Sequence, residues 1–143
     1  MENKVFGTLN YDGGWCKKEI ITFWKKDCEV KINVSAYENE EPNKEQMDSY
    51  IKFKNEIDKF SEVTLKKLKE YMSEIEDDIK VYCNIPRISE NIFDYVTIKE
   101  ILFIENGSFG IMCDCKWDSH GIAVLCTKTS VEVGMQDIVW LES

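Results

Sequence analysis

The sequence predicts an α+β fold, with an N-terminal antiparallel β-meander, a central helix or helical hairpin, and a C-terminal four-stranded antiparallel meander. Three observations predict this fold. Apolar and polar residues alternate with a strand period near both ends, the period becomes helical in the middle, and turn-forming dipeptides separate the strands. Strands, then helix, then strands is the order typical of α+β domains. A length of 143 residues predicts a single domain, 1–143.

Three strands are expected in the N-terminal meander. The clearest has Cys28, Val30, Ile32 and Val34 on one face and polar residues on the other, which is typical of a half-buried antiparallel strand. Paired glycines after Tyr11 accept positive φ and predict a turn. The expected strands are residues 4–11, 15–24 and 28–35, with connections at 11–14 and 25–27.

A helical period begins at Lys44, after a loop that contains Pro42. Asn43 is the expected N-cap, and Gln46, three residues later, is its expected capping-box partner. One apolar stripe continues over residues 47–75, which predicts either one long helix or two helices jointed near Ser61.

The acids Glu76, Asp77 and Asp78 are expected to end the helix, where carboxylates oppose the helix dipole. The next stretch, residues 80–97, is the least periodic in the chain. Here residues 81–83 are expected to form a short strand, and residues 89–91 to begin one helical turn.

The C-terminal third is expected to return to strands. Asn106-Gly107 between two apolar runs predicts a hairpin with a type I′ turn. A five-residue turn at 117–121 and a tight turn at Lys128-Thr129 separate the later strands. The expected strands are residues 98–105, 109–116, 122–127 and 130–135, and residues 138–141 close the chain.

Charge and composition bound the function. Acids outnumber bases 27 to 18, for a net charge of −9, which argues against a nucleic-acid partner and favours either a basic protein partner or simple solubility. The N-terminus has no apolar run of signal-peptide length, and no stretch is long and apolar enough to span a membrane. A cytoplasmic protein with six reduced thiols is therefore expected, and no C-x-x-C pair occurs.

The only histidine lies in the segment Trp117-Asp118-Ser119-His120-Gly121. One hypothesis is a metal site formed by Cys113, Cys115, His120 and Cys126, because thiolates and imidazole are zinc ligands. If Lys116 pairs with Ile122 across a five-residue turn, Cys126 points to the opposite face from the other two thiols, although a one-residue register shift would reverse this. No metal and no cofactor are therefore expected.

Catalysis by the same segment is a second hypothesis. Asp118 and His120 could form an acid–base pair, with Cys115 as the nearest thiol. Alternatively, Asp118 caps its own turn, Gly121 supplies a positive φ and Trp117 packs against the core. We favour this structural role and expect no catalytic residue.

Three motifs give the chain a resemblance to a family of small uncharacterised bacterial proteins. The first is F-G-x-L-x-Y followed by a tryptophan, the second is a helix opened by glutamine with tyrosine four residues on, and the third is W-D-x-x-H-G-[LI]-[GA]-V with a later V-x-V-G. Residues 6–11 and Trp15 match the first motif. Gln46 and Tyr50 match the second, with a later Tyr71. Residues 117–124 match the third, and residues 131–134 match its later V-x-V-G. Ser119 stands where the family has an acid.

Some members of that family resemble immunity proteins of toxin–immunity systems, so the resemblance implies an intracellular protein that binds a partner. The favoured hypothesis is therefore a protein-binding module, such as an immunity protein that neutralises a basic toxin domain through an acidic surface. The expected contact residues are Glu38, Glu40, Glu41, Glu76, Asp77 and Asp78. The alternatives are a small hydrolase-like enzyme that uses Asp118 and His120, or a structural or regulatory domain.

Overall fold

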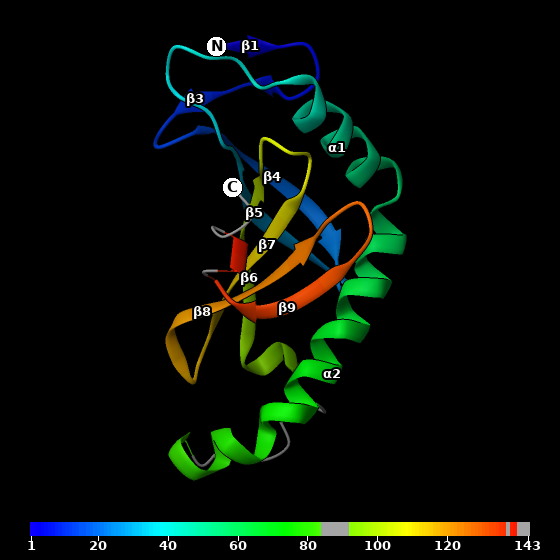
Figure 1. Cartoon of the computed structure of the whole chain (residues 1–143), viewed down its shortest axis with the longest axis vertical. Helices are drawn as coiled ribbons and strands as arrows, with labels where there is room; N and C mark the ends of the chain where they lie inside the picture. Colours follow the sequence, from blue (N-terminus) through cyan, green and yellow to red (C-terminus); the bar gives the residue numbers. More distant parts are fainter. Residues whose placement is uncertain (84–91, 137, 140–143) are drawn as a thin grey trace.

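The fold is α+β, as predicted, with two helices on one face of a seven-stranded sheet (Figure 1). The computed structural model describes residues 1–83, 92–136 and 138–139, apart from the side chains of residues 76–83, 94, 118 and 119. The strands are β1 (Glu2–Asn3), β2 (Gly7–Thr8), β3 (Asn10–Tyr11), β4 (Trp15–Phe23), β5 (Lys26–Val34), β6 (Val96–Phe103), β7 (Phe109–Cys115), β8 (Asp118–Cys126) and β9 (Val131–Met135). The helices are α1 (Lys44–Asn55), α2 (Ile57–Cys83) and the short 3-10 helix η1 (Ile92–Asp94).

The predicted N-terminal meander is present in part, because β3, β4 and β5 pair antiparallel in that order. The strand expected over residues 4–11 is present only in part, since residues 4–6 turn the chain back so that β2 pairs with β1, and only β3 pairs with β4. Asn3 accepts hydrogen bonds at its Oδ1 from the backbone N–H groups of Val5 and Phe6, at 2.8 and 2.9 Å. This Asx-type turn separates β1 from β2, which form a small sheet of their own.

The hairpin between β4 and β5 is tighter than predicted. Phe23 pairs with Lys26, so only Trp24 and Lys25 form the connection, and both have positive φ, 51° and 66°. Two consecutive residues with positive φ are the pattern of a type I′ turn. Trp24 is held there by α2, because its backbone N–H donates to the Ser61 hydroxyl at 2.7 Å.

A parallel pairing of β5 with β6 joins the two predicted meanders into one sheet, and the sequence did not predict it. Parallel neighbours require a long crossover connection, and α1 and α2 lie in this one. The order along the sheet is β3-β4-β5-β6-β7-β8-β9, so the predicted C-terminal four-stranded meander forms its second half.

The helix α1 begins as predicted. Asn43 accepts from the N–H of Gln46 at 2.8 Å, and the Gln46 side chain accepts from the N–H of Asn43 at 2.9 Å, which completes the capping box. The joint between the helices lies at Glu56, five residues before the predicted Ser61. The helix α2 continues to Cys83, so the strand predicted at 81–83 is wrong, and the turn predicted at 89–91 lies outside the described residues.

The hairpin predicted at Asn106-Gly107 is confirmed between β6 and β7, but its turn is not type I′. Gly107 has φ +89°, whereas Asn106 does not have a positive φ, and the N–H of Gly107 donates to the carbonyl of Ile104 at 2.9 Å. A three-residue loop that ends in a glycine at positive φ accounts for this geometry. At the C-terminus, residues 138–139 are helical rather than extended, and residues 140–141 lie outside the described residues.

Both faces of the sheet are covered. The larger core lies under the helices, where Phe53, Leu68 and Met72 pack against inward residues of β4–β8. The smaller core lies on the opposite face and includes Val139. Its buried members are Leu102, Ile104, Met112, Ala123, Leu125 and Val139. None of the helices in the described part of the chain has the length and apolarity to cross a membrane.

Candidate functional site

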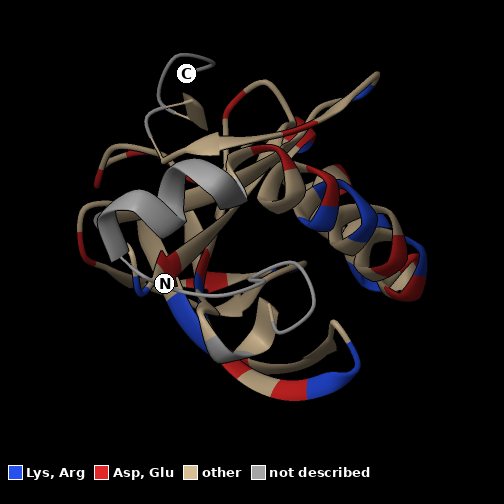
Figure 2. Cartoon of the chain, turned by 90° about the horizontal axis from the view of Figure 1, so that it is seen from below, with Lys and Arg blue, Asp and Glu red and all other residues tan. Residues whose placement is uncertain are grey.

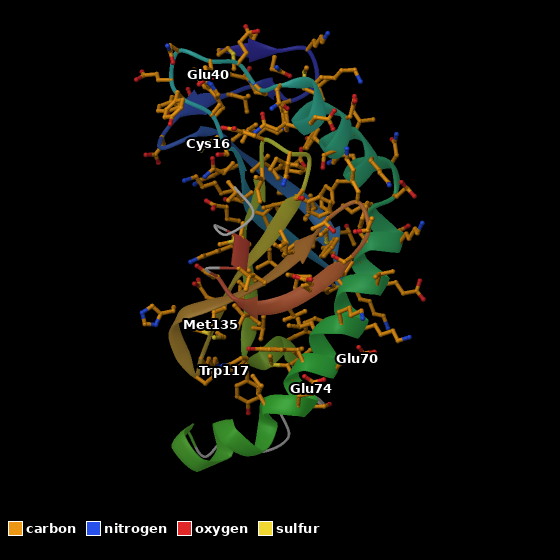
Figure 3. The ribbon with its side chains drawn as sticks, viewed as in Figure 1. Cys16, Glu40, Glu70, Glu74, Trp117 and Met135 are labelled. Carbon is orange, nitrogen blue, oxygen red and sulfur yellow. The ribbon has the colours of Figure 1, made fainter. Side chains whose placement is uncertain are left out.

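The loop between β5 and α1, residues 35–43, presents three of the predicted partner-binding acids to solvent. Glu38, Glu40 and Glu41 are exposed, and Tyr37 beside them is the most exposed large apolar side chain described, at 72%. The loop lies at one end of the molecule's long axis, where Glu40 is labelled in Figure 3. Tyrosine is enriched at protein interfaces, because its ring offers a large contact area with few rotatable bonds.

Two aromatic side chains, one from β3 and one from β4, fix the backbone of this loop. The Tyr11 hydroxyl donates to the carbonyl of Ala36 at 3.1 Å, and the Trp15 indole N–H donates to the carbonyl of Glu40 at 2.6 Å. The two rings also contact each other edge to face, with centroids 5.2 Å apart. The Glu40 N–H also donates to the Tyr37 carbonyl at 3.0 Å. The exposed turn is therefore held both by a hydrogen bond of its own and by the side chains of Tyr11 and Trp15.

The helix end of the loop is anchored just as firmly. Gln46 is 1% exposed, and its amide Nε2 donates to the carbonyls of Ser35 at 2.7 Å and Phe103 at 3.1 Å. Asn43 donates through Nδ2 to the carbonyl of Glu105 at 3.1 Å. These bonds tie the loop to the ends of the parallel strands β5 and β6, so it is preorganised before any partner arrives.

We call Asp12, Trp15, Tyr37, Glu38, Glu40 and Glu41 the acidic-aromatic surface. Asp12 belongs to the turn between β3 and β4, and its ion pair with Lys31, at 3.7 Å, is largely solvent-exposed. Exposed ion pairs of this kind contribute little to stability. The surface therefore combines four carboxylates with two aromatic side chains on a fixed backbone, a chemistry suited to a basic protein partner.

The second predicted group of acids lies on α2. The side chains of Glu76, Asp77 and Asp78 lie outside the described residues. Glu74, on the same helix, is labelled in Figure 3 toward the opposite end of the molecule from Glu40. The sequence did not predict the roles of Tyr11, Trp15 and Tyr37, although an aromatic residue next to acids in a loop with a proline is a signal for Tyr37.

The segment Trp117–Gly121 is not the five-residue turn that the sequence predicted. Lys116 and Trp117 alone connect β7 to β8, because Cys115 pairs with Asp118. The register then shifts, so that three residues of β8, 119–121, lie opposite the single residue Asp114 of β7. An insertion of this kind is a β-bulge, and it bends the strand and redirects its side chains.

Gly121 allows this bulge to form. Its φ is +71°, and a Cβ at this position would lie 2.3 Å from the Cys113 carbonyl oxygen and 2.5 Å from the Gln136 Nε2 atom. The same Gln136 nitrogen donates to the Cys113 carbonyl at 3.1 Å. The positive φ expected of Gly121 is therefore confirmed, and the glycine is also required by close approach.

His120 is exposed at this bulge, and Trp117 is partly buried against the larger core. The side chains of Asp118 and Ser119 lie outside the described residues. Neither of the two surface hollows described below is lined by His120. Among the described residues, no group of three or more His, Cys, Asp and Glu side chains is placed to hold a metal ion.

The face assignment of the thiols was wrong because the predicted register was wrong. Cys113 pairs with Ile122 and Cys126 pairs with Phe109, so both thiols point into the core under the helices. Along β8 the two positions are four residues apart, about 13 Å at the usual rise per residue, which is too far for a shared ligand. Burial raises the pKa of Cys113 above its ordinary value and raises the pKa of Cys126 to about 12, so both are protonated core thiols.

Comparison with known proteins identifies a family without adding a residue role. No curated protein and no solved structure matches the chain. A match to a family described as a domain of unknown function, DUF6985, covers residues 5–140. This span includes both the acidic-aromatic surface and the Trp117–Gly121 segment, and the chain belongs to the DUF6985 family.

Proposed function

We propose that the protein is a cytoplasmic protein-binding module that recognises a basic protein partner through the acidic-aromatic surface. A toxin domain neutralised by an immunity protein is the partner we favour. The observation that carries the proposal is the fixed backbone of residues 35–43, held by Tyr11, Trp15 and Gln46, while residues 37–41 within it are exposed.

Preorganisation matters because a loop that is already ordered loses little conformational entropy on binding. Tyr37 supplies apolar contact area, and aromatic residues are common among those that dominate binding energy. The exposed carboxylates would steer a basic partner toward this end of the molecule and raise the association rate. The resemblance to a family of which some members resemble immunity proteins points the same way.

The proposal is tested by affinity capture from the protein's own cells at low salt, with the product of the adjacent gene included. Measurement of the association rate with the purified partner then tests the surface itself. The double variant Glu38→Lys and Glu40→Lys is expected to slow association about tenfold at low salt, because two charges that attract the partner become repulsive. Tyr37→Ser is expected to act mainly on the dissociation rate.

Glu29→Lys is the matched control, since Glu29 is an exposed glutamate of β5 outside the surface. Glu29→Lys changes the net charge as much as each Glu→Lys substitution in the acidic-aromatic surface does, but it should leave the association rate nearly unchanged. Equal effects of the surface and control variants would show that only net charge matters. Failure to find any tight-binding partner at low salt would remove the proposal.

A further inference from the structure

A second surface, separate from the acidic-aromatic surface, runs between the helices and the last hairpin of the sheet. This hollow has a volume of about 820 Å³ and lies where the β8–β9 connection runs beside α1 and α2 (Figure 1). It is open rather than enclosed and shares no residue with the acidic-aromatic surface. Its volume is in the range of sites that take a small molecule or the anchor residues of a peptide.

The floor of the hollow is apolar. Phe60 and Val63 of α2 form one side, and Phe109 and Val131 of the sheet form the other. Val63 is 38% exposed. The rings of Phe60 and Phe109 contact each other edge to face with centroids 5.2 Å apart, which fixes the shape of the floor.

The rim carries a small excess of positive charge, in contrast to the chain as a whole. Four lining residues are lysines and three are acids, whereas in the complete chain acids outnumber bases 27 to 18. Lysines and acids are mixed along the helices, as Figure 2 shows. The rim lysines are Lys52, Lys59, Lys67 and Lys128, and we call the hollow the lysine groove.

The acids of the lysine groove are already paired within the protein. Glu45 bonds Lys128 across the groove at 3.1 Å, Asp48 bonds Lys44 at 2.8 Å, and Glu56 lies 3.6 Å from Lys59. In contrast, Lys52 has no ion pair among the described residues, and Lys67 lies at 3.9 Å from Glu70, the limit of such a contact. The surplus positive charge therefore lies on the helix wall, at Lys52 of α1 and Lys67 of α2.

We propose that the lysine groove binds an acidic segment of a partner polypeptide, with one apolar anchor side chain on Phe60 and Val63 and flanking carboxylates on the lysines. An apolar anchor and adjacent carboxylates match the two chemistries that the groove offers, an apolar floor and a basic rim. An uncharged apolar segment would leave the lysines without counter-charges, and a basic segment would be repelled by them.

The probe is a fluorescein-labelled synthetic peptide, Glu-Glu-Leu-Phe-Glu-Glu, titrated with the full-length protein and followed by fluorescence anisotropy. Two matched peptides separate the chemistries: one has lysines in place of glutamates, and one has serines in place of leucine and phenylalanine. Saturable binding of the acidic apolar peptide alone is expected. Equal binding of the basic peptide would overturn the proposal.

Salt gives an independent readout. A protein of net charge −9 repels an acidic peptide in general, so non-specific binding should strengthen as salt screens that repulsion. Binding at the lysine groove should instead weaken with salt, because the local contacts are attractive. Affinity that rises with salt would place the peptide elsewhere and contradict the proposal.

Variants locate the site. Val63→Asp and Lys52→Glu are each expected to weaken binding about tenfold, since one removes the anchor contact and the other reverses an unpaired rim charge. Lys69→Glu is the control, because Lys69 lies on α2 outside the groove and lines a different hollow. Far-UV circular dichroism confirms that each variant is folded. Unchanged affinity in both groove variants, or an equal loss in Lys69→Glu, would overturn the assignment.

Discussion

Gly121 shows how one residue can serve both the local backbone and its neighbours. It has the positive φ that the bulge in β8 requires, and it also lies against the Cys113 carbonyl and the Gln136 amide. From the sequence, a glycine after His120 predicted only the backbone role. The close approach depends on the pairing of β7 with β8 and on the position of Gln136, and neither is encoded locally.

Gly121→Ala is expected to destabilise the protein by about 3 kcal/mol, through positive φ in a residue with a side chain and a clash with the Cys113 carbonyl. Gly13→Ala is the matched control, because Gly13 has the same φ of +71° but nothing within 4 Å of the added Cβ. It should cost about 1 kcal/mol. Urea unfolding measures both, and equal costs would show that the close contact is unimportant.

At the scale of elements, local signals located most helices and strands. Asn43 and Gln46 predicted the start of α1, and the alternation from Cys28 to Val34 predicted β5. The failures occurred where a short chain segment is set by distant contacts. The turn at Trp24 and Lys25 is one case, because two non-glycine residues at positive φ are stabilised by α2, with the Trp24 indole N–H donating to Thr64 Oγ1 at 3.0 Å.

In the candidate site, too, local features could be predicted from the sequence, whereas features set by distant contacts could not. Exposure of Glu38, Glu40 and Glu41 followed from their place in a polar loop, and the structure confirms it. The hydrogen bonds that fix the loop were not predictable, since Tyr11 and Trp15 are each 25 residues from the carbonyls that they bind.

A polar network connects α1 to the sheet and gives an element-scale prediction. The Tyr50 hydroxyl donates to Glu19 Oε1 at 2.6 Å, Lys54 donates to Glu19 Oε2 at 2.9 Å, and Lys17 lies 3.2 Å from the same carboxylate. Burial opposes ionisation of Glu19, but the hydrogen bonds from Tyr50 and Lys54 and the charge of Lys17 outweigh it and lower its pKa. Burial and the Glu19 carboxylate both raise the pKa of Tyr50.

Because the Glu19 pKa is lower in the folded protein than in the unfolded chain, its contribution to stability is fully present above the unfolded pKa of about 4.3 and is lost as pH falls through the folded value. Glu19→Gln is therefore expected to cost roughly 1–3 kcal/mol at neutral pH. The difference from the unmodified protein should shrink below about pH 4. Urea unfolding at several pH values measures this, and a constant difference would contradict it.

At the scale of the whole molecule, the sheet is one structure where the sequence predicted two meanders. The pairing of Lys31–Val34 with Glu100–Phe103 joins residues about 70 positions apart, and no local pattern records it. The second core was also not predicted. It depends on Val139, which lies over Gly110 of β7 after the chain has left β9.

The packing of Val139 on Gly110 predicts that the two positions are energetically coupled. A Cβ on Gly110 would lie 2.7 Å from a Val139 methyl carbon, so Gly110→Ala should displace the end of the chain and cost about 2 kcal/mol. Val139→Ala should cost roughly 2 kcal/mol, because Val139 is fully buried. In the double variant the new methyl group of Gly110→Ala occupies space that the valine has vacated, so the combined loss should be smaller than the sum by about 1 kcal/mol.

Urea unfolding of the unmodified protein, the two single variants and the double variant measures this coupling. Met135→Ala, at an exposed position of β9, is the control and should be additive with Gly110→Ala. Strict additivity of Gly110→Ala and Val139→Ala would mean that Val139 does not pack on Gly110 to cover this face of the sheet.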